Sequence, residues 1–134
     1  MGNIYVTGLD FDSVTGINYA TIKYDSQGRQ VWVARFEAKG SGFLQNNLAL
    51  DKKGNVYVTG FAGTVKYDSS GQQVWVKPFK GSVIAMDDDD NLFVTGSGGT
   101  VKYDSSGSEL WTGSLSGLDL AIDAQGNVLL AGTN

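Results

Sequence analysis

A phrase that returns at a fixed interval restricts the fold of this chain more than any other feature. Its copies lie at residues 2–8 (GNIYVTG), 54–60 (GNVYVTG) and 91–96 (NLFVTG), with a weaker copy at 126–132 (GNVLLAG). A second phrase, Thr-Ile/Val-Lys-Tyr-Asp, follows each of the first three copies and leads into a Ser-x-Gly turn and a tryptophan. Asn55, Asn91 and Asn127 are spaced 36 residues apart. Such regular self-similarity indicates a repeat protein.

Each repeat is predicted to hold four short strands. In the second repeat the strands are expected at 48–50, 55–59, 64–67 and 73–76, with glycine-ended turns at 51–54 and 68–71. The strands are rich in Val, Ile, Tyr and Trp, and apolar residues do not recur at helical spacing. A 36-residue unit of four antiparallel strands is typical of a β-propeller blade.

The strand at 55–59 carries apolar side chains on both of its faces. Val56, Tyr57 and Val58 alternate in direction, so a sheet packed on one side only would leave one of these faces in water. We therefore expect each sheet to be covered on both sides by neighbouring blades. The three tryptophans, Trp32, Trp75 and Trp111, occupy one equivalent position and are interpreted as packing residues between blades.

The Asp-x-x-Gly-Asn-Val-Tyr-Val-Thr-Gly segment, followed by Lys-Tyr-Asp and a glycine turn, resembles the bacterial β-propeller repeat called SBBP, with a looser similarity to NHL repeats. The resemblance covers essentially the whole chain. It implies bladed propellers within bacterial surface or secreted proteins, and hence an extracellular or cell-surface location. It provides no shared catalytic residues.

The whole chain, residues 1–134, is interpreted as one propeller-repeat segment of about three blades. Blade 1 spans 2–36 and lacks its first strand, blade 2 spans 43–79, blade 3 spans 82–115, and the first two strands of a closing blade lie at 118–132. Propellers usually have four to eight blades. If each end face exposed roughly 400 Å² of apolar surface, leaving both in water would cost about 20 kcal/mol, which exceeds the stability of a typical domain.

We therefore expect the ring to close by oligomerisation, with a six-bladed homodimer favoured. Residues 118–123 of one chain would supply the missing first strand of the partner's blade 1. Residues 127–131 then duplicate residues 3–7 of the partner, so one copy must be displaced or added at an edge. A trimer of nine blades and a fragment of a larger bacterial surface propeller are the alternatives.

Composition excludes several classes of function. The chain has no cysteine and no histidine, so thiol chemistry, the usual general base and the preferred zinc ligands are missing. Its net charge is −4 and its ten basic residues are scattered, which argues against nucleic-acid binding. No apolar stretch of membrane-spanning length is present. No cofactor, no resident metal and no membrane partner are predicted.

The first repeat is longer than the others at two places. Nine extra residues lie between its second and third strands and seven lie between its last strand and the next repeat, and both connections should emerge on one face of the ring. The candidates for contacting a glycan or protein ligand on this face are Asp10, Asp12, Asn18, Tyr19, Glu37, Lys39, Gln45 and Asn46. Solvated loops that bind nothing are the simpler alternative.

Acidic residues also raise the alternatives of a metal site and of carboxylate catalysis. The segment 10–16 begins like a calcium loop but lacks the later acidic ligands, and Asp87 to Asp90 fills a position that is a hairpin turn in the other repeats. The carboxylates of Asp12 and Glu37 could form a glycosidase-type pair. The favoured function is nevertheless a non-enzymatic scaffold or binding module that self-associates, and a carboxylate-dependent enzyme such as a glycoside hydrolase is the alternative.

Overall fold

The computed structural model describes residues 2–39 and 46–132 of the 134-residue chain. Within these ranges the protein is all-β, with thirteen strands arranged in four antiparallel sheets and no helix. None of the described residues forms a helix that could cross a bilayer.

The sheets follow the chain, and each strand pairs with its neighbour in sequence. The first sheet contains β1 (Ile4–Asp12), β2 (Gly16–Tyr24) and β3 (Gln30–Glu37). The second contains β4 (Asn46–Leu50), β5 (Val56–Gly60), β6 (Gly63–Tyr67) and β7 (Gln73–Lys77). The third contains β8 (Val83–Met86), β9 (Leu92–Gly96), β10 (Gly99–Tyr103) and β11 (Glu109–Gly113). The last contains β12 (Asp119–Ile122) and β13 (Val128–Ala131).

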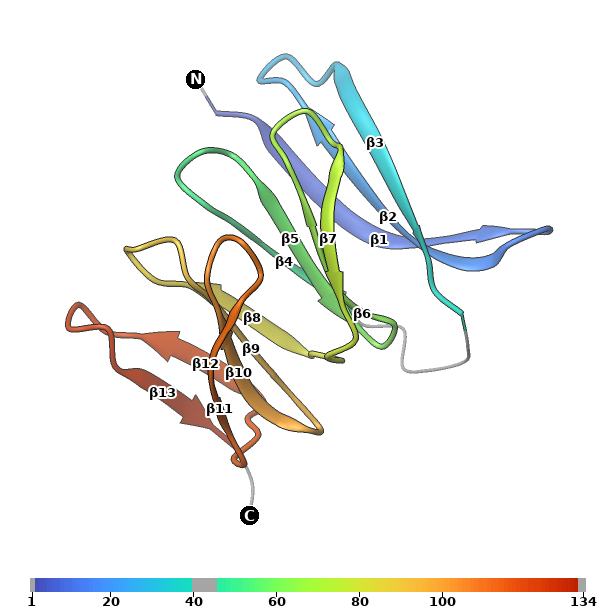
Figure 1. Ribbon diagram of the computed structural model, residues 1–134. Coiled ribbons are helices and arrows are strands. Elements are labelled where there is room, and N and C mark those ends of the chain that lie inside the picture. Colours follow the sequence, from blue (N-terminus) through green and yellow to red (C-terminus); the bar gives the residue numbers. More distant parts are fainter. Residues whose placement is uncertain (1, 40–45, 133–134) are drawn as a thin grey trace.

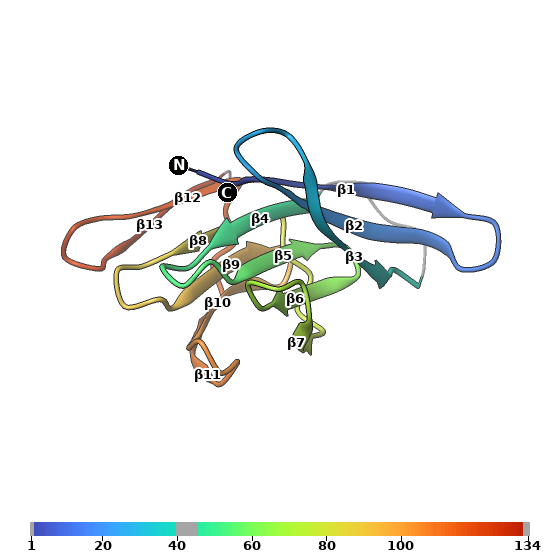
Figure 2. The ribbon, with the colours of Figure 1, turned by 90° about the horizontal axis from the view of Figure 1, so that it is seen from above.

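The four sheets stand in a row in chain order, from the blue sheet that holds the N-terminus to the red sheet that holds the C-terminus (Figure 1). Strands β4, β8 and β12, each the first of its sheet, lie side by side, and β1 takes the corresponding place beside β4 (Figure 2). This is the arrangement of consecutive propeller-like blades, with the first sheet lacking a strand on that side.

Two hydrophobic clusters hold the first three sheets together, one between the first and second sheets and one between the second and third. Val56 and Val58 of β5 face the first sheet, whereas Tyr57 of the same strand joins the cluster that faces the third. All three side chains are fully buried. The prediction that this strand is covered on both faces is confirmed, because alternate residues of one strand enter different cores.

The tight turns owe their shape to aspartate at the first position. Asp51 Oδ1 accepts the backbone N–H groups of Lys53 at 3.0 Å and Asn55 at 2.9 Å, and its Oδ2 accepts the side-chain amide of Asn55 at 2.7 Å. Burial raises the pKa of Asp51, but these bonds outweigh it and leave the pKa below 3.8. Equivalent bonds repeat at Asp87 and Asp123, which explains the recurrence of Asp and Asn in the sequence. The turn that begins at Asp87 is therefore a hairpin, as predicted.

The prediction of a nine-residue loop between the second and third strands of the first repeat is wrong. These residues lengthen β1 and β2, which pair without interruption from Ile4 with Tyr24 to Asp12 with Gly16. The alternation of apolar side chains at Leu9 and Phe11 suits a pleated strand, and this explains why the insertion continues the ladder. Only the turn between Asp12 and Gly16 is irregular.

Candidate functional site

The predicted ligand residues of the first repeat lie on two different surfaces. Asp10, Asn18 and Glu37 form one row across β1, β2 and β3, because Asp10 pairs with Asn18 and Asn18 pairs with Glu37. Asp10 accepts a hydrogen bond from Arg35 Nε at 2.7 Å. The row is thus partly neutralised by an ion pair of its own sheet.

Two other candidates join the first sheet to the second. Tyr19 is fully buried, and its hydroxyl accepts the backbone N–H of Ala62 at 2.5 Å. Burial raises the pKa of the Tyr19 phenol, which therefore stays protonated at neutral pH. Asn46 donates from Nδ2 to Thr7 Oγ1 at 3.1 Å. Both side chains are engaged in holding two sheets together.

The remaining candidates lie toward the tip of the hairpin and in the connection to the second sheet. Asp12 Oδ1 accepts the backbone N–H groups of Val14 at 2.7 Å and Thr15 at 3.0 Å, which lowers the pKa of Asp12. Lys39 is exposed just beyond β3, and Gln45 lies outside the described residues. In residues 2–39 and 46–132 no group of three or more acidic side chains is placed to hold a metal ion.

The hairpin tip exposes two apolar side chains. Phe11 is 78% exposed and Val14 is 89% exposed, on the part of β1 and β2 that extends past the other strands of the row (Figure 1). Leu9 and Tyr19, one step closer to the sheet, pack against the second sheet instead. The tip therefore carries the two most exposed apolar side chains of the long hairpin.

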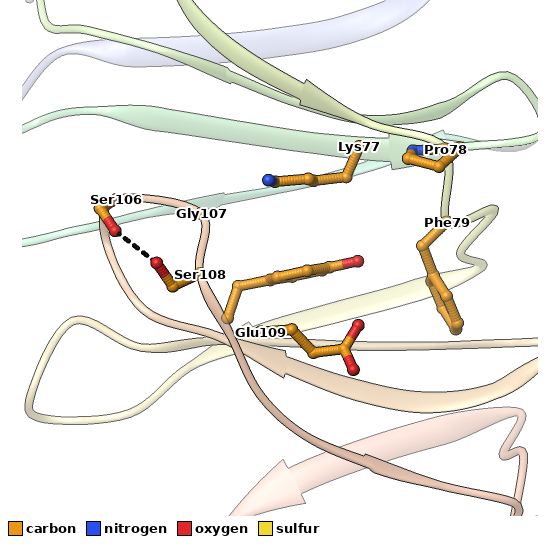
Figure 3. A pocket seen from close by; sticks show the side chains of 8 residues that line it. Lys77, Pro78, Phe79, Ser106, Gly107, Ser108 and Glu109 are labelled. Carbon is orange, nitrogen blue, oxygen red and sulfur yellow. Dashed lines mark hydrogen bonds between the residues drawn. The ribbon is translucent and has the colours of Figure 1, made fainter.

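A pocket of 620 Å³ lies at the junction of the second and third sheets, at the end of β7 and beside the turn that precedes β11 (Figure 3). Lys77 and Glu109 lie on opposite sides of it, so it presents one positive and one negative group. Burial, with a smaller contribution from the charge of Glu109, raises the pKa of Tyr103 in its wall. The complete lining is Lys77, Pro78, Phe79, Tyr103, Ser106, Gly107, Ser108 and Glu109.

This pocket was not predicted from the sequence, and its charges do not recur along the chain. The positions equivalent to Lys77 and Glu109 in the preceding junction hold Ala34 and Gln73. The signal in the sequence is that Lys77 and Glu109 are charged whereas Ala34 and Gln73, at the equivalent positions, are not. The pocket offers the Tyr103 phenol, the Lys77 ammonium and the Glu109 carboxylate, which together can hydrogen-bond a small polar group.

Comparison with known proteins identifies the repeat. A family model described as outer membrane protein assembly factor BamB matches residues 18–112 and again residues 62–133. The chain belongs to this family. Its repeat is of the β-propeller type, in agreement with the stacked four-stranded sheets. The match is to the BamB family, so the narrower SBBP or NHL assignment stays a prediction.

Other comparisons add little to this family assignment. No curated protein matches the chain. Among solved structures, a protein of unknown function from Bacteroides caccae aligns with a TM-score of 0.49 at 13% identity, over 92% of this chain and 52% of that protein. The chain thus spans about half the length of this structural neighbour.

Proposed function

We propose that this chain is a non-catalytic β-propeller scaffold that self-associates to complete a ring of blades. The supporting observation is a difference between equivalent residues. Val56 and Val58 are fully buried against the first sheet, whereas Ile4 and Val6, at the same positions of the first sheet, are 53% and 47% exposed. The first sheet therefore presents the face of an internal blade without a blade in front of it.

At the other end of the row, the third sheet has a tryptophan that no following blade covers in the part of the chain that the structure describes. Trp32 and Trp75 pack with tilted rings against tyrosines of the next sheet, Tyr67 and Tyr103. Trp111 contacts Phe93 within its own sheet and is 39% exposed. Since the last sheet has no strand equivalent to β6 among the described residues, the tyrosine that would cover Trp111 is missing.

Two copies arranged head to tail satisfy both ends at once. The exposed face of the first sheet of one copy meets the exposed face of the third sheet of the other, and a two-fold axis repeats this junction. With three blades per chain, the ring has six. Burying apolar side chains that are half exposed in the single copy supplies the driving force.

The non-catalytic part of the proposal rests on the carboxylates of the long hairpin. The backbone N–H groups of Thr15 and Val14 bind Asp12 Oδ1 and lower the pKa of Asp12, which disfavours it as a general acid, and Asp10 is paired with Arg35. The family model that matches the chain carries the description of an outer membrane protein assembly factor, and this description supports a scaffold. The assembly of a ring from two copies requires binding between the copies and no catalysis.

A ligand-binding role of the hairpin tip is the second candidate function. Phe11 and Val14 are apolar but largely exposed, and packing within the chain does not explain this exposure. They lie at the tip of a hairpin that the first sheet holds in place. We propose that this tip contacts a glycan or protein ligand. A glycan array probed with the wild type and with Phe11→Ala tests binding of a glycan, because a glycan bound equally by both would place the contact elsewhere.

The mass of the protein in solution tests the proposed scaffold. Light scattering across a dilution series should give twice 14.2 kDa. A single species at the monomer mass, with unchanged circular dichroism down to low concentration, would show that the open faces tolerate water. Turnover of a glycoside that is abolished by Asp12→Ala, with the fold retained, would support the enzyme instead.

A further inference from the structure

A set of polar contacts recurs at both junctions between the first three sheets. At the junction of the second and third sheets, Lys66 Nζ donates to the Ser105 carbonyl at 2.6 Å and Trp75 Nε1 donates to the same carbonyl at 3.4 Å. At the preceding junction, Lys23 Nζ and Trp32 Nε1 donate to the Ser69 carbonyl at 3.3 Å and 3.1 Å. One carbonyl of each turn thus receives two hydrogen bonds from the preceding sheet.

A glycine beneath the indole completes this arrangement, which we call the turn lock. Gly71 has φ of +87° and lies so close to Trp32 that a Cβ would approach its Cδ2 to 2.8 Å. Gly107 has φ of +86° and lies similarly close to Trp75, so that a Cβ would stand 3.1 Å from its Cε2. The turn lock therefore has a donor half, Lys and Trp, and an acceptor half, a serine carbonyl two residues before a φ-positive glycine.

Each end of the row carries one half of a turn lock. The acceptor half of the first sheet is the turn at residues 25–28, where Gly28 has φ of +79° and a Cβ added to it would meet no atom within 4 Å. The donor half of the third sheet is Lys102 and Trp111, and Lys102 Nζ lies 3.2 Å from Asp87 Oδ2. These two halves have the same residue types as the halves that meet inside the chain, but they belong to opposite ends of the row and do not meet each other within one copy.

We infer that a second copy of this chain binds through these halves, so that Trp111 and Lys102 of one copy donate to the Ser26 carbonyl of the other and the indole covers Gly28. The inference rests on the proposed self-association and names its contacts. It places the partner's first sheet where the next blade would stand. The two internal turn locks provide the geometry of this junction.

In the proposed dimer, β13 of one copy and β1 of the partner compete for the same position, so one of them must be displaced. The partner's β1 would occupy the position of β13 beside β12. Strand β1 is held to β2 by nine residue pairs, whereas β13 is held to β12 by four. Because β1 has the stronger internal pairing, we infer that β13 is displaced and β12 pairs with the partner's β1.

Sedimentation equilibrium of the full chain with single substitutions tests the turn lock. Gly28→Ala and Trp111→Phe should each raise the dimer dissociation constant at least about tenfold, through overpacking or loss of the indole donor at both junctions of the ring. Gly16→Ala is the matched control, since Gly16 has φ of +81° and equally open surroundings but lies at the tip of the long hairpin, outside the turn lock and outside the hairpin of β12 and β13. Circular dichroism should be unchanged in all three.

Strand displacement is tested by a disulfide in a chain that has no cysteine of its own. Ala121 and Leu129 are directly paired between β12 and β13, so Ala121→Cys with Leu129→Cys should lock β13 in place when oxidised. The oxidised protein should be monomeric and the reduced protein dimeric. A dimer under both conditions would overturn the displacement of β13.

The outcomes separate the turn lock from self-association. A wild-type protein that stays monomeric overturns the proposed scaffold and this inference together. A wild-type dimer whose dissociation constant is unaffected by Gly28→Ala and Trp111→Phe leaves the scaffold standing and overturns the turn lock. A loss of dimer that is equal in Gly16→Ala also overturns it, because the effect would then come from backbone strain.

Discussion

Gly71 provides the sharpest test of how the sheets are held together. Alanine at this position imposes two separate costs. The first is left-handed strain at φ of +87°, about 1–2 kcal/mol for a residue with a Cβ. The second is a clash, since the added carbon would lie 2.8 Å, 3.0 Å and 3.1 Å from three atoms of the Trp32 indole.

The clash can be separated from the strain by a matched substitution. Gly126 has φ of +80°, and a Cβ added there would meet nothing within 4 Å, so Gly126→Ala carries the strain alone. Overpacking of a filled site costs about 1–3 kcal/mol. We therefore expect Gly71→Ala to lower the free energy of unfolding by about 2–5 kcal/mol and Gly126→Ala by about 1–2 kcal/mol. For a chain of this length, the difference corresponds to about 4–11 °C in Tm.

Urea unfolding followed by tryptophan fluorescence measures both variants at one protein concentration. The indole of Trp32 also donates to Ser69 in the same turn, so its emission should change more in Gly71→Ala than in Gly126→Ala. Equal losses of stability in the two variants would refute the reasoning. They would show that the indole yields to a methyl group without cost and that packing at this junction is loose.

Three further predictions concern other buried or strained groups. The Tyr67 hydroxyl is buried with no hydrogen-bond partner among the described residues, whereas the Tyr57 hydroxyl donates to Asp51 at 3.1 Å. Tyr67→Phe should thus be neutral or stabilising by up to about 1 kcal/mol, and Tyr57→Phe destabilising by about 1–3 kcal/mol, in urea unfolding. Because the folded pKa of Asp51 is depressed, its stabilisation is present above about pH 4 and is lost as the pH falls through that folded value, so Asp51→Asn should flatten the acid limb of a stability–pH curve. Asp90 adopts φ of +61° and accepts the backbone N–H of Lys52 at 3.1 Å, so Asp90→Ala should cost about 1–2 kcal/mol and Asp90→Gly should restore most of the melting temperature.

The repeat pattern predicts the four-stranded blade correctly but does not predict the long hairpin of the first repeat. The burial of Val56, Tyr57 and Val58 follows from alternation that has apolar groups on both faces, and this signal depends on neighbouring residues only. The length of the insertion after the first phrase departs from the repeat, and this departure alone predicts a loop. Its own alternation, with Leu9 and Phe11 before the turn and Tyr19 after it, predicts the strands that the structure contains.

The predicted ligand residues show a different limit. Asp10, Asn18 and Glu37 lie in one row, but Tyr19 contacts the second sheet, and Asn46 lies in the second sheet and contacts the first. Sequence spacing places residues on a hairpin without showing which side of it a neighbouring sheet will cover. That information depends on the stacking of blades, which is a long-range property of the fold.

The turn lock explains why the stretch Lys-Tyr-Asp-Ser-x-Gly is the same in all three repeats. Its lysine donates a hydrogen bond to the following sheet, while its first serine carbonyl and its glycine contact the preceding sheet. Any sheet built from the stretch therefore has one donor face and one acceptor face, and a row of such sheets always ends in two unlike, mutually complementary surfaces. Head-to-tail surfaces of this kind close into a ring only when the rotation between sheets permits, and otherwise extend into filaments. Light scattering that found large assemblies of many sizes would therefore retain the turn lock but contradict the six-bladed ring.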